Sequence, residues 1–416
     1  MGLVLGRKEC RRVREIDSWT LLYGRRKVGK TTLLRRCARY DIYMTVSQTR
    51  ESGFLGDRLS PVPLRDAMDD IARTLRSGGA AVIDEFQRLP PEHMDALAQL
   101  APRGILIASG SSYGVVDRIL GGGSPLLGHM LPVEIDIISY EDALAQLGDP
   151  IMAAIYRDPW IIPFVDSVER LGERLGELVL IAKGLIGEVF REEERELADT
   201  YWRALLMVAE GRWRSSEIAG ALGLRGGEAS ASSMLSRLSR MGLVRGIPTL
   251  GRERYNVVRS PALSLMLYAE AKYMVSELGP SSGLLALPLG REIQFSVGEM
   301  LAARFGASQH YSPREDVDVV LVRGRRREWA FEVKAGEFSA QEAGAAVERM
   351  RRVAEMVGLV SLSGRPPDAG ADLSLGPREL LEMARSMSGD LGMPGRGPQP
   401  RSPRIAFTSR RPSAAQ

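Results

Sequence analysis

The sequence predicts an α/β protein in which a doubly wound, mainly parallel sheet precedes a helical lid, a winged helix-turn-helix and a second, smaller α/β domain. Short apolar strands alternate with amphipathic helices in the first third of the chain. Helical periodicity then dominates, and two β-runs around an arginine-rich turn come later. We expect the parts at 1–139, 140–210, 211–275 and 276–385, with a disordered tail, rich in Pro, Gly, Ser and Arg, at 386–416.

The first strand, 19–23, runs into GRRKVGKT, a complete G-x-x-x-x-G-K-S/T phosphate-binding loop, and then into a helix. Gly24 and Gly29 permit positive φ and close approach of a polyphosphate, toward which the loop amides and the helix N-terminus point partial positive charge. Lys30 is expected to reach the β- and γ-oxygens, and Thr31 to place its hydroxyl on Mg²⁺. The residues predicted to bind the nucleotide are Gly24, Arg25, Arg26, Lys27, Val28, Gly29, Lys30, Thr31 and Thr32. A chance glycine-rich turn is the alternative, and the strand–loop–helix setting favours an ATP- or GTP-binding protein.

A second acidic motif supports this interpretation. After a strand at 42–46, a Gly- and Pro-containing loop and a helix at 64–76, the apolar run 80–83 is predicted to form a buried strand that ends in Asp84 and Glu85. This is the Walker B pattern: the aspartate would hold Mg²⁺ through water, and the glutamate would polarise the attacking water. The alternative is an acidic pair on the surface at a strand end.

A further strand, 104–108, ends in the serine-rich segment 109–112. Ser109 and Ser111 are candidates for contact with the nucleotide, although a serine-rich turn explains the segment equally well. A strand-like run at 131–138 completes the predicted doubly wound pattern.

The middle of the chain predicts two helical units. Residues 140–210 form the expected lid, in which the charged run 191–195 is interpreted as a solvated helix face. From 213 onward two helices and a two-stranded wing at 242–258 follow in the order of a winged helix-turn-helix. The side chains predicted to face DNA are Ser232, Ser233, Ser236, Arg237 and Arg240 on the second helix and Arg252 and Arg254 on the wing. Packing against neighbouring domains is the alternative.

The C-terminal domain carries a second candidate site. After a linker at 280–290, a helix at 295–305 contains Glu299, and two strands contain Asp318 and the pair Glu332 and Lys334. Residues two apart on a strand share a face. If the hairpin centres on residue 325, Asp318 pairs across from Glu332, because 318 + 332 = 2 × 325.

Facing carboxylates repel each other unless a divalent cation lies between them, so this arrangement predicts a Mg²⁺ or Mn²⁺ site with Asp318, Glu332 and Glu299 as ligands. Lys334 would orient or activate the attacking water or stabilise a pentavalent phosphate. Arg323–Arg327 would contact DNA phosphates. The alternatives are a salt-bridged solvent face and a charged loop tip. The chain has six lysines among 56 basic residues, so a lysine retained at 30 or 334 suggests that a compact ammonium is needed there.

The segments GRKE, YGRRKVGKTTLL, VIDEFQRL, ASGSS and SPLLGHM, in this order, resemble the archaeal-type ATPase family within the AAA+/STAND P-loop NTPases. The resemblance covers about 1–270. It implies an ATPase that uses ATP and Mg²⁺, a serine sensor beside the γ-phosphate, a winged helix and a PD-(D/E)xK nuclease-like, restriction-endonuclease-like C-terminal domain. Where the family usually ends the last segment in Gly-Arg, this chain has His129, a poor substitute for arginine, and Arg118 is a candidate replacement.

Composition limits the remaining possibilities. The net charge is +4 and the share of hydrophobic residues is 44%, as in ordinary globular proteins. Cys10 and Cys37 are far apart in sequence and indicate neither a disulfide framework nor a zinc site. No apolar run approaches the ~20 residues of a membrane span, and the N-terminus does not resemble a signal peptide, so we expect a cytoplasmic protein without a membrane partner.

The function predicted from these motifs is an ATP-hydrolysing, nucleotide-dependent switch that acts on DNA, with possible Mg²⁺-dependent nuclease activity and possible oligomerisation. The rival hypothesis is a regulatory STAND-type ATPase whose winged helix and inactive nuclease-like domain only bind partners.

Overall fold

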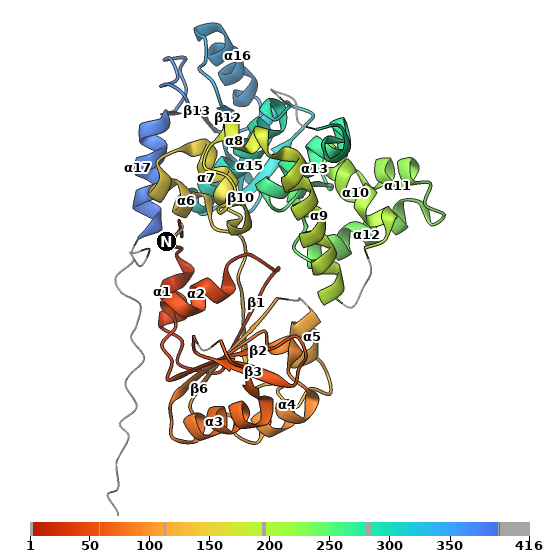
Figure 1. The fold of residues 1–416 in the computed structure, drawn as a ribbon. Helices are drawn as coiled ribbons and strands as arrows, with labels where there is room; N and C mark the ends of the chain where they lie inside the picture. The colour runs from red at the N-terminus through yellow and green to blue at the C-terminus, as the bar shows by residue number, and fades with distance from the viewer. Residues whose placement is uncertain are drawn as a thin grey trace, which may run out of the picture.

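The computed structural model describes residues 3–57, 59–111, 114–193, 197–279, 284–389 and 391. Its N-terminal part, red to orange in Figure 1, is a seven-stranded sheet with the order β4-β3-β2-β5-β6-β1-β7. Strands β2, β5, β6, β1 and β7 are parallel, and β3 and β4 continue the sheet antiparallel at one edge. The bounds are β1 (Thr20–Tyr23), β2 (Ile42–Val46), β3 (Ser52–Leu55), β4 (Val62–Pro63), β5 (Ala80–Asp84), β6 (Ile105–Gly110) and β7 (Leu131–Glu134).

Helices cover both faces of this sheet because its strands are apolar on both sides. Leu21 contributes to the core beneath α3 and α4, and its neighbour Leu22 contributes to the core beneath α1 and α2. The helices are α1 (Glu9–Arg14), α2 (Lys30–Cys37), α3 (Leu64–Arg76), the 3₁₀ turn η1 (Phe86–Arg88), α4 (Pro91–Ala98) and α5 (Gly114–Leu120). The α/β prediction with a mainly parallel sheet is therefore confirmed, and β6 separates the loop-bearing strand β1 from the acidic strand β5.

Two local predictions need correction. The segment expected to be a loop after β2 contains β3 and β4, whose few paired residues give too little periodicity to be recognised in the sequence. The strand expected over 131–138 ends at Glu134.

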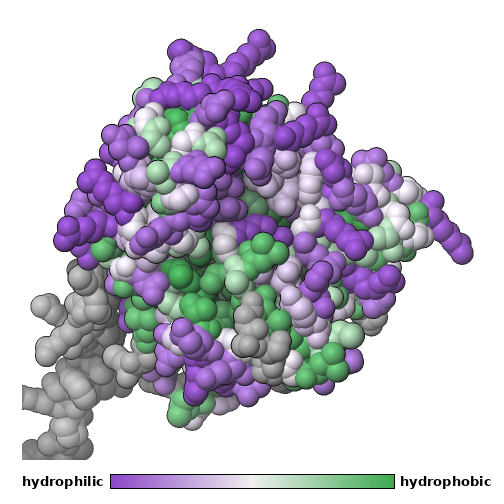
Figure 2. All heavy atoms as spheres, turned by 90° about the horizontal axis from the view of Figure 1, so that it is seen from above, coloured by the Kyte–Doolittle hydropathy of each residue, from purple (hydrophilic) through white to green (hydrophobic). Residues whose placement is uncertain are grey.

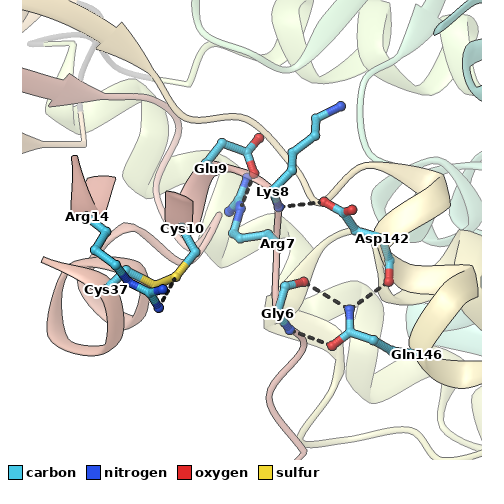
Figure 3. The surroundings of a disulfide bond; sticks show 9 residues. All are labelled: Gly6, Arg7, Lys8, Glu9, Cys10, Arg14, Cys37, Asp142 and Gln146. Carbon is cyan, nitrogen blue, oxygen red and sulfur yellow. Dashed lines mark hydrogen bonds and ion pairs between the residues drawn. A yellow bond between two sulfur atoms is a disulfide. The ribbon is translucent and has the colours of Figure 1, made fainter. Parts of the chain in front are cut away.

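The two cysteines form a disulfide, contrary to the sequence interpretation. Cys10 on α1 and Cys37 at the end of α2 lie with their Cα atoms 5.3 Å apart, since the two helices pack side by side (Figure 3). A separation of 27 residues in sequence says nothing about this packing. The disulfide therefore ties α1 to the helix that follows the phosphate-binding loop.

The helical region comprises α6 (Tyr140–Leu147), α7 (Pro150–Tyr156), the 3₁₀ turn η2 (Pro159–Ile161), α8 (Val168–Glu173) and α9 (Leu175–Glu192). Gly6 and Gln146 exchange hydrogen bonds of 2.7 and 3.0 Å, and the Lys8 amide donates to Asp142, so the segment before α1 is fixed to α6 (Figure 3).

A helical unit with a two-stranded hairpin follows, green in Figure 1. It consists of α10 (Asp199–Glu210), α11 (Ser215–Leu222), α12 (Gly227–Arg240), the antiparallel strands β8 (Val244–Pro248) and β9 (Arg254–Val258), α13 (Pro261–Tyr273) and α14 (Val275–Leu278). Trp213, Tyr255, Phe295 and Tyr311 form an aromatic cluster that joins this hairpin to the C-terminal domain.

The C-terminal domain is a five-stranded mixed sheet with the order β10-β11-β12-β13-β14. Its elements are α15 (Ala286–Phe305), β10 (Ser308–Ser312), β11 (Val317–Arg323), β12 (Arg326–Lys334), α16 (Ala340–Arg351), β13 (Met356–Ser361), β14 (Leu373–Leu375) and α17 (Pro377–Ser388). Seen from above, hydrophilic side chains frame this face of the molecule and hydrophobic ones gather toward its middle (Figure 2).

Helix α15 begins before residue 295, where the sequence predicted its start, and takes in part of the expected linker. Pro288 is compatible with this because it lies in the first turn, where its missing N–H has no helical partner to lose. Helix α17 packs against α6 and extends to Ser388, so the predicted tail at 386–416 begins too early, and most of that tail lies outside the described residues. No helix among the described residues is long and apolar enough to cross a membrane.

Candidate functional site

The phosphate-binding loop connects β1 to α2 with a backbone that few residue types tolerate. Gly24 and Gly29 have φ values of 153° and 94°, and Lys27 also has a positive φ of 68°. A Cβ at position 24 would collide with the carbonyl oxygen of Ile135, which follows the neighbouring strand β7. The loop can therefore pass close to β7 only with glycine at this position.

Lys30, the first residue of α2, folds back over the loop. Its Nζ donates to the carbonyl oxygens of Gly24 and Arg25 at 2.8 and 3.1 Å. Burial lowers the pKa of Lys30 to about 8, although the charges of Glu192, Glu85 and Asp84 act to raise it. A buried ammonium held only by carbonyl dipoles and distant carboxylates is suited to binding an anion.

Thr31 and Asp84 meet below the loop. The threonine hydroxyl donates to the Asp84 carboxylate at 2.7 Å, and the Tyr43 hydroxyl donates to the same oxygen at 2.7 Å. A hydroxyl and a carboxylate are hard oxygen ligands of the kind that Mg²⁺ prefers alongside water and phosphate oxygens. Within the described ranges, no group of three or more His, Cys, Asp and Glu side chains could hold a metal without such added ligands.

Glu85 follows Asp84 in a left-handed conformation with φ 59°, which turns its side chain toward the end of β6. Its carboxylate accepts from the Gln87 amide at 2.7 Å and lies 3.3 Å from Arg88. Ser111 lies 3.5 Å from the same carboxylate, whereas Ser109 is fully buried and its hydroxyl has no partner among the residues that the structure describes. Both predicted serines are thus near the acidic motif; Ser112 lies outside the described residues.

These groups line one cavity of about 870 Å³. The loop, Asp84, Glu85 and the two serines form its polar side. The opposite wall comes from η2 and α9 and is largely apolar, with Pro159, Trp160, Pro163, Phe164, Ile181 and Leu185. A polar floor and an apolar, partly aromatic wall suit a phosphorylated ligand with a flat ring system.

Two arginines that the sequence assigned only to nucleotide contact have structural partners. Arg25 is buried and forms an ion pair with the fully buried Asp158 before η2. Arg26 pairs with Glu188 and Glu192 of α9 at 2.5 and 2.6 Å. Partial burial acts to lower the pKa of Arg26, but its hydrogen bond to Glu192 and the charges of Glu192, Glu188 and Glu85 raise it.

Other residues of this site were missed or left open. Arg7, from the GRKE segment, is buried and donates to the carbonyl oxygens of Val28 and Asp136 at 2.9 and 2.7 Å, so it supports the loop from behind. His129 is exposed and does not line the cavity. Arg118 donates to the Gln87 carbonyl at 2.9 Å, next to the acidic motif.

The C-terminal sheet brings Asp318 and Glu332 together. The pairing of Val319 with Phe331, continued by one residue, places them opposite each other, although a two-residue turn and a register shift produce this alignment instead of a turn centred on residue 325. Burial and then the charge of Glu332 raise the pKa of Asp318 to about 7. Burial also raises the pKa of Glu332, against the opposing charge of Arg349, which lies 2.9 Å away on α16.

The other two predicted members of this site have charged partners of their own. Glu299 is held by Arg157 and Arg245 and is not brought to the carboxylate pair, so the prediction of three carboxylate ligands needs correction. Arg157 lies directly after α7 and Arg245 lies on β8, so both partners of Glu299 come from segments distant in sequence. Lys334 pairs with Glu342 of α16 at 2.8 Å.

The residues predicted to face DNA are mostly accessible. Ser232, Ser233, Ser236 and Arg240 are exposed on α12, while Arg237 donates to the Tyr201 hydroxyl at 3.1 Å. In the arginine-rich turn, Arg323 pairs with Glu328, and Arg326 pairs with Glu355. A cavity of about 320 Å³ lies between the hairpin and the β10–β11 turn. Its charged lining consists of four arginines and two glutamates: Arg214, Arg252, Arg314, Arg327, Glu253 and Glu315.

The loop between a parallel strand and a helix, with an acidic strand two places along the sheet, is an arrangement typical of P-loop nucleotide-binding domains. No protein-family model matches the chain, and neither does any curated protein. Solved structures to which it is similar include the Orc1 protein of Aeropyrum pernix in complex with DNA, at 15% identity and a TM-score of 0.26 over 67% of this chain and 95% of that one. The ADP form of the Orc2 protein of the same organism has 13% identity and a TM-score of 0.27, covering 64% and 91% of the two chains. Cdc6p of Pyrobaculum aerophilum has 13% identity and a TM-score of 0.22, with the same coverage. TM-scores below 0.5 do not establish a common overall fold, so the site geometry carries the functional conclusion.

Proposed function

We propose that the chain is an ATP-binding, ATP-hydrolysing P-loop NTPase of the AAA+ type that works as a nucleotide-dependent switch. The observation that carries this proposal is the meeting of Lys30, the Thr31–Asp84 pair and Glu85 on the polar side of one cavity. The apolar wall from η2 and α9 would receive the base and so make the lid sensitive to bound nucleotide.

Each polar group has a distinct task in hydrolysis. Lys30 would leave its carbonyl partners for the β- and γ-phosphate oxygens, and Thr31 and Asp84 would hold Mg²⁺, which neutralises charge on those phosphates. Glu85 would orient a water toward the γ-phosphorus and accept its proton as the bond to the ADP oxygen breaks. Ser109, whose hydroxyl is buried among these groups, is suited to contact the γ-phosphate.

The first test measures ATP binding by calorimetry and phosphate release with Mg²⁺. Lys30→Ala should weaken ATP binding at least tenfold, and Glu85→Gln should retain binding while reducing turnover at least a hundredfold. Asp95→Asn, on α4 and away from the cavity, is a matched control that should leave both unchanged. Normal ATP binding by Lys30→Ala would refute the proposal.

A second activity, Mg²⁺- or Mn²⁺-dependent DNA cleavage, is favoured by the Asp318–Glu332 pair. The two carboxylates are partly buried and their pKa values are raised, so their charged forms are unfavourable without a cation. A divalent cation between them would also hold a phosphodiester oxygen next to the pair. Lys334, once released from the exposed Glu342, would stabilise the charge that develops on the phosphate.

The arginine-lined cavity between the hairpin and the β10–β11 turn supports DNA as the partner. Arg252 lies at the hairpin tip, Arg314 lies four residues before Asp318, and Arg327 lies five residues before Glu332. Arginines spaced across two domains in this way suit the phosphates of a strand that leads toward the carboxylates.

Plasmid and single-stranded DNA, incubated with Mg²⁺ or Mn²⁺ with and without ATP, separate this activity from the regulatory alternative. Cleavage by the wild type that is lost in Glu332→Ala would support a nuclease. Absence of cleavage, with salt-dependent DNA binding that weakens in Arg252→Ala/Arg314→Ala, would leave a DNA-binding switch. If neither is observed while ATP is bound, the regulatory NTPase that binds only protein partners is the better description.

A further inference from the structure

Two carboxylates of the lid helix α9 form ion pairs with Arg26 of the phosphate-binding loop. Glu188 lies 2.5 Å from Nε of Arg26, and Glu192, one helical turn later, lies 2.6 Å from Nη1. The three side chains are largely or half buried, with exposed fractions of 41% for Glu188, 14% for Glu192 and 22% for Arg26. The Arg26–Glu192 pair, the more buried of the two, is stronger than an ion pair on an open surface.

The group formed by Arg26, Glu188 and Glu192 lies at the end of the cavity that contains the acidic motif. Arg26 lies close enough to Glu85 for the glutamate to raise its pKa, and Glu192 acts in the same way on Lys30. Glu188 and Arg191 line the cavity together with Lys30 and Thr31. The α9 carboxylates therefore supply negative charge close to the place where the motif would hold the terminal phosphate.

The carboxylates and a terminal phosphate cannot share this position without cost. Like charges about 7 Å apart at an effective dielectric constant of ~20 repel enough to change an affinity about tenfold or more. A γ-phosphate and Arg26 attract each other strongly, since charge-assisted hydrogen bonds from arginine to phosphate can be bidentate. A diphosphate, which ends before this position, competes less.

We propose that the γ-phosphate of ATP displaces Glu188 and Glu192 from Arg26, so that α9 is attached to the loop without nucleotide or with ADP and is released by ATP. This inference rests on the proposed ATP binding and adds to it the group that distinguishes the two nucleotides. Arg191, on the same turn of α9 and in the lining of the cavity, would then contact the phosphate in place of the carboxylates.

A movement of α9 would affect the rest of the molecule through the helices that pack against it. Helix α9 packs against α13 and α14, and α13 packs against α10 of the helix–hairpin unit. Glu193, directly after α9, also accepts hydrogen bonds from the Gly114 amide at 3.2 and 3.3 Å, so the same helix end touches α5. A shift of α9 therefore changes contacts on both the nucleotide side and the DNA side of the chain.

Calorimetric binding of the non-hydrolysable analogue AMP-PNP and of ADP, both with Mg²⁺, tests the proposal on the full chain. Glu188→Gln/Glu192→Gln should bind AMP-PNP about tenfold more tightly and ADP less than threefold more tightly than the wild type. Glu177→Gln, on the same helix and exposed beside Arg174, is the matched control and should change neither affinity. Arg26→Ala should lose the preference for the triphosphate, and Arg26→Lys should retain part of it.

Hydrogen–deuterium exchange gives a second readout. AMP-PNP, but not ADP, should increase exchange over residues 187–192 of α9 in the wild type, and the double glutamine variant should show high exchange without nucleotide. Equal gains in affinity for AMP-PNP and ADP, or unchanged exchange, would overturn the inference while ATP binding stands. A wild type that binds neither nucleotide would instead overturn the proposed function and this inference with it.

Discussion

Arg25 of the phosphate-binding loop and Asp158 before η2 form an ion pair that is almost completely removed from solvent, with exposed fractions of 2% and 0%. The pair joins the nucleotide-binding core to the lid through residues 133 positions apart in sequence. Its immediate neighbours, Pro159 and Trp160, line the apolar wall of the cavity. The position of that wall relative to the loop therefore depends on this contact.

Breaking the pair from one side should be costly. Asp158→Ala leaves the Arg25 guanidinium buried without a counter-charge, and we expect the free energy of unfolding to fall by about 3–5 kcal/mol. Arg25→Met/Asp158→Leu removes both charges and should recover most of this loss. Urea denaturation of the three proteins measures it. A double variant as unstable as Asp158→Ala would indicate that packing, and not the unpaired charge, is responsible.

The disulfide between Cys10 and Cys37 should stabilise the N-terminal domain. A closed loop of this length reduces the entropy of the unfolded chain by an amount worth about 3.5 kcal/mol. Thermal melts with and without dithiothreitol should therefore differ by several degrees, and Cys10→Ser/Cys37→Ser should melt at the reduced temperature in both conditions. Identical melts of the wild type in both conditions would show that the bond does not form in solution.

The sequence predicted the elements that repeat a strong local pattern. The loop with Lys30 and the strand before Asp84 are continuous in sequence, and each carries its own signal of glycine spacing or apolar run. Their meeting through Thr31 could be expected because parallel strands end at the same edge of a sheet. The opposition of Asp318 and Glu332 was also predicted by counting residues across one hairpin, but the turn and the register shift that produce it were not.

Contacts between distant segments could not be predicted in this way. Nothing near Glu299 in the sequence shows that Arg157 and Arg245 face it. The interpretation of 191–195 as a solvated face also missed Glu192, because helical periodicity does not report which neighbour covers a charged face.

Tyr43 should matter for nucleotide binding although it carries no motif. Its hydroxyl donates to the Asp84 oxygen that also accepts from Thr31, which fixes the carboxylate in the orientation a Mg²⁺ ion would need. Tyr43→Phe should weaken Mg²⁺-dependent ATP binding about tenfold and leave Mg²⁺-free binding unchanged. Tyr40→Phe, whose ring packs against Tyr43, is the matched control. Equal loss with and without Mg²⁺ would assign Tyr43 to packing alone.

The Asp318–Glu332 pair should make stability depend on pH. Because burial and Glu332 raise the pKa of Asp318 from 3.8 to about 7, the folded state binds more protons than the unfolded chain between those values. The free energy of unfolding therefore falls as pH rises from about 4 to 7, and the pair destabilises the protein above pH 7 by at most about 4 kcal/mol. Asp318→Asn should be more stable than the wild type at pH 8 and similar to it at pH 4.

Glu348→Gln, exposed on α16, is the control that should follow the wild type at both pH values. Adding Mn²⁺ at pH 8 should stabilise the wild type and not Asp318→Asn, since a cation between the carboxylates removes their repulsion. A wild type whose stability is independent of pH over this range would show that the two carboxylates are not in contact in solution.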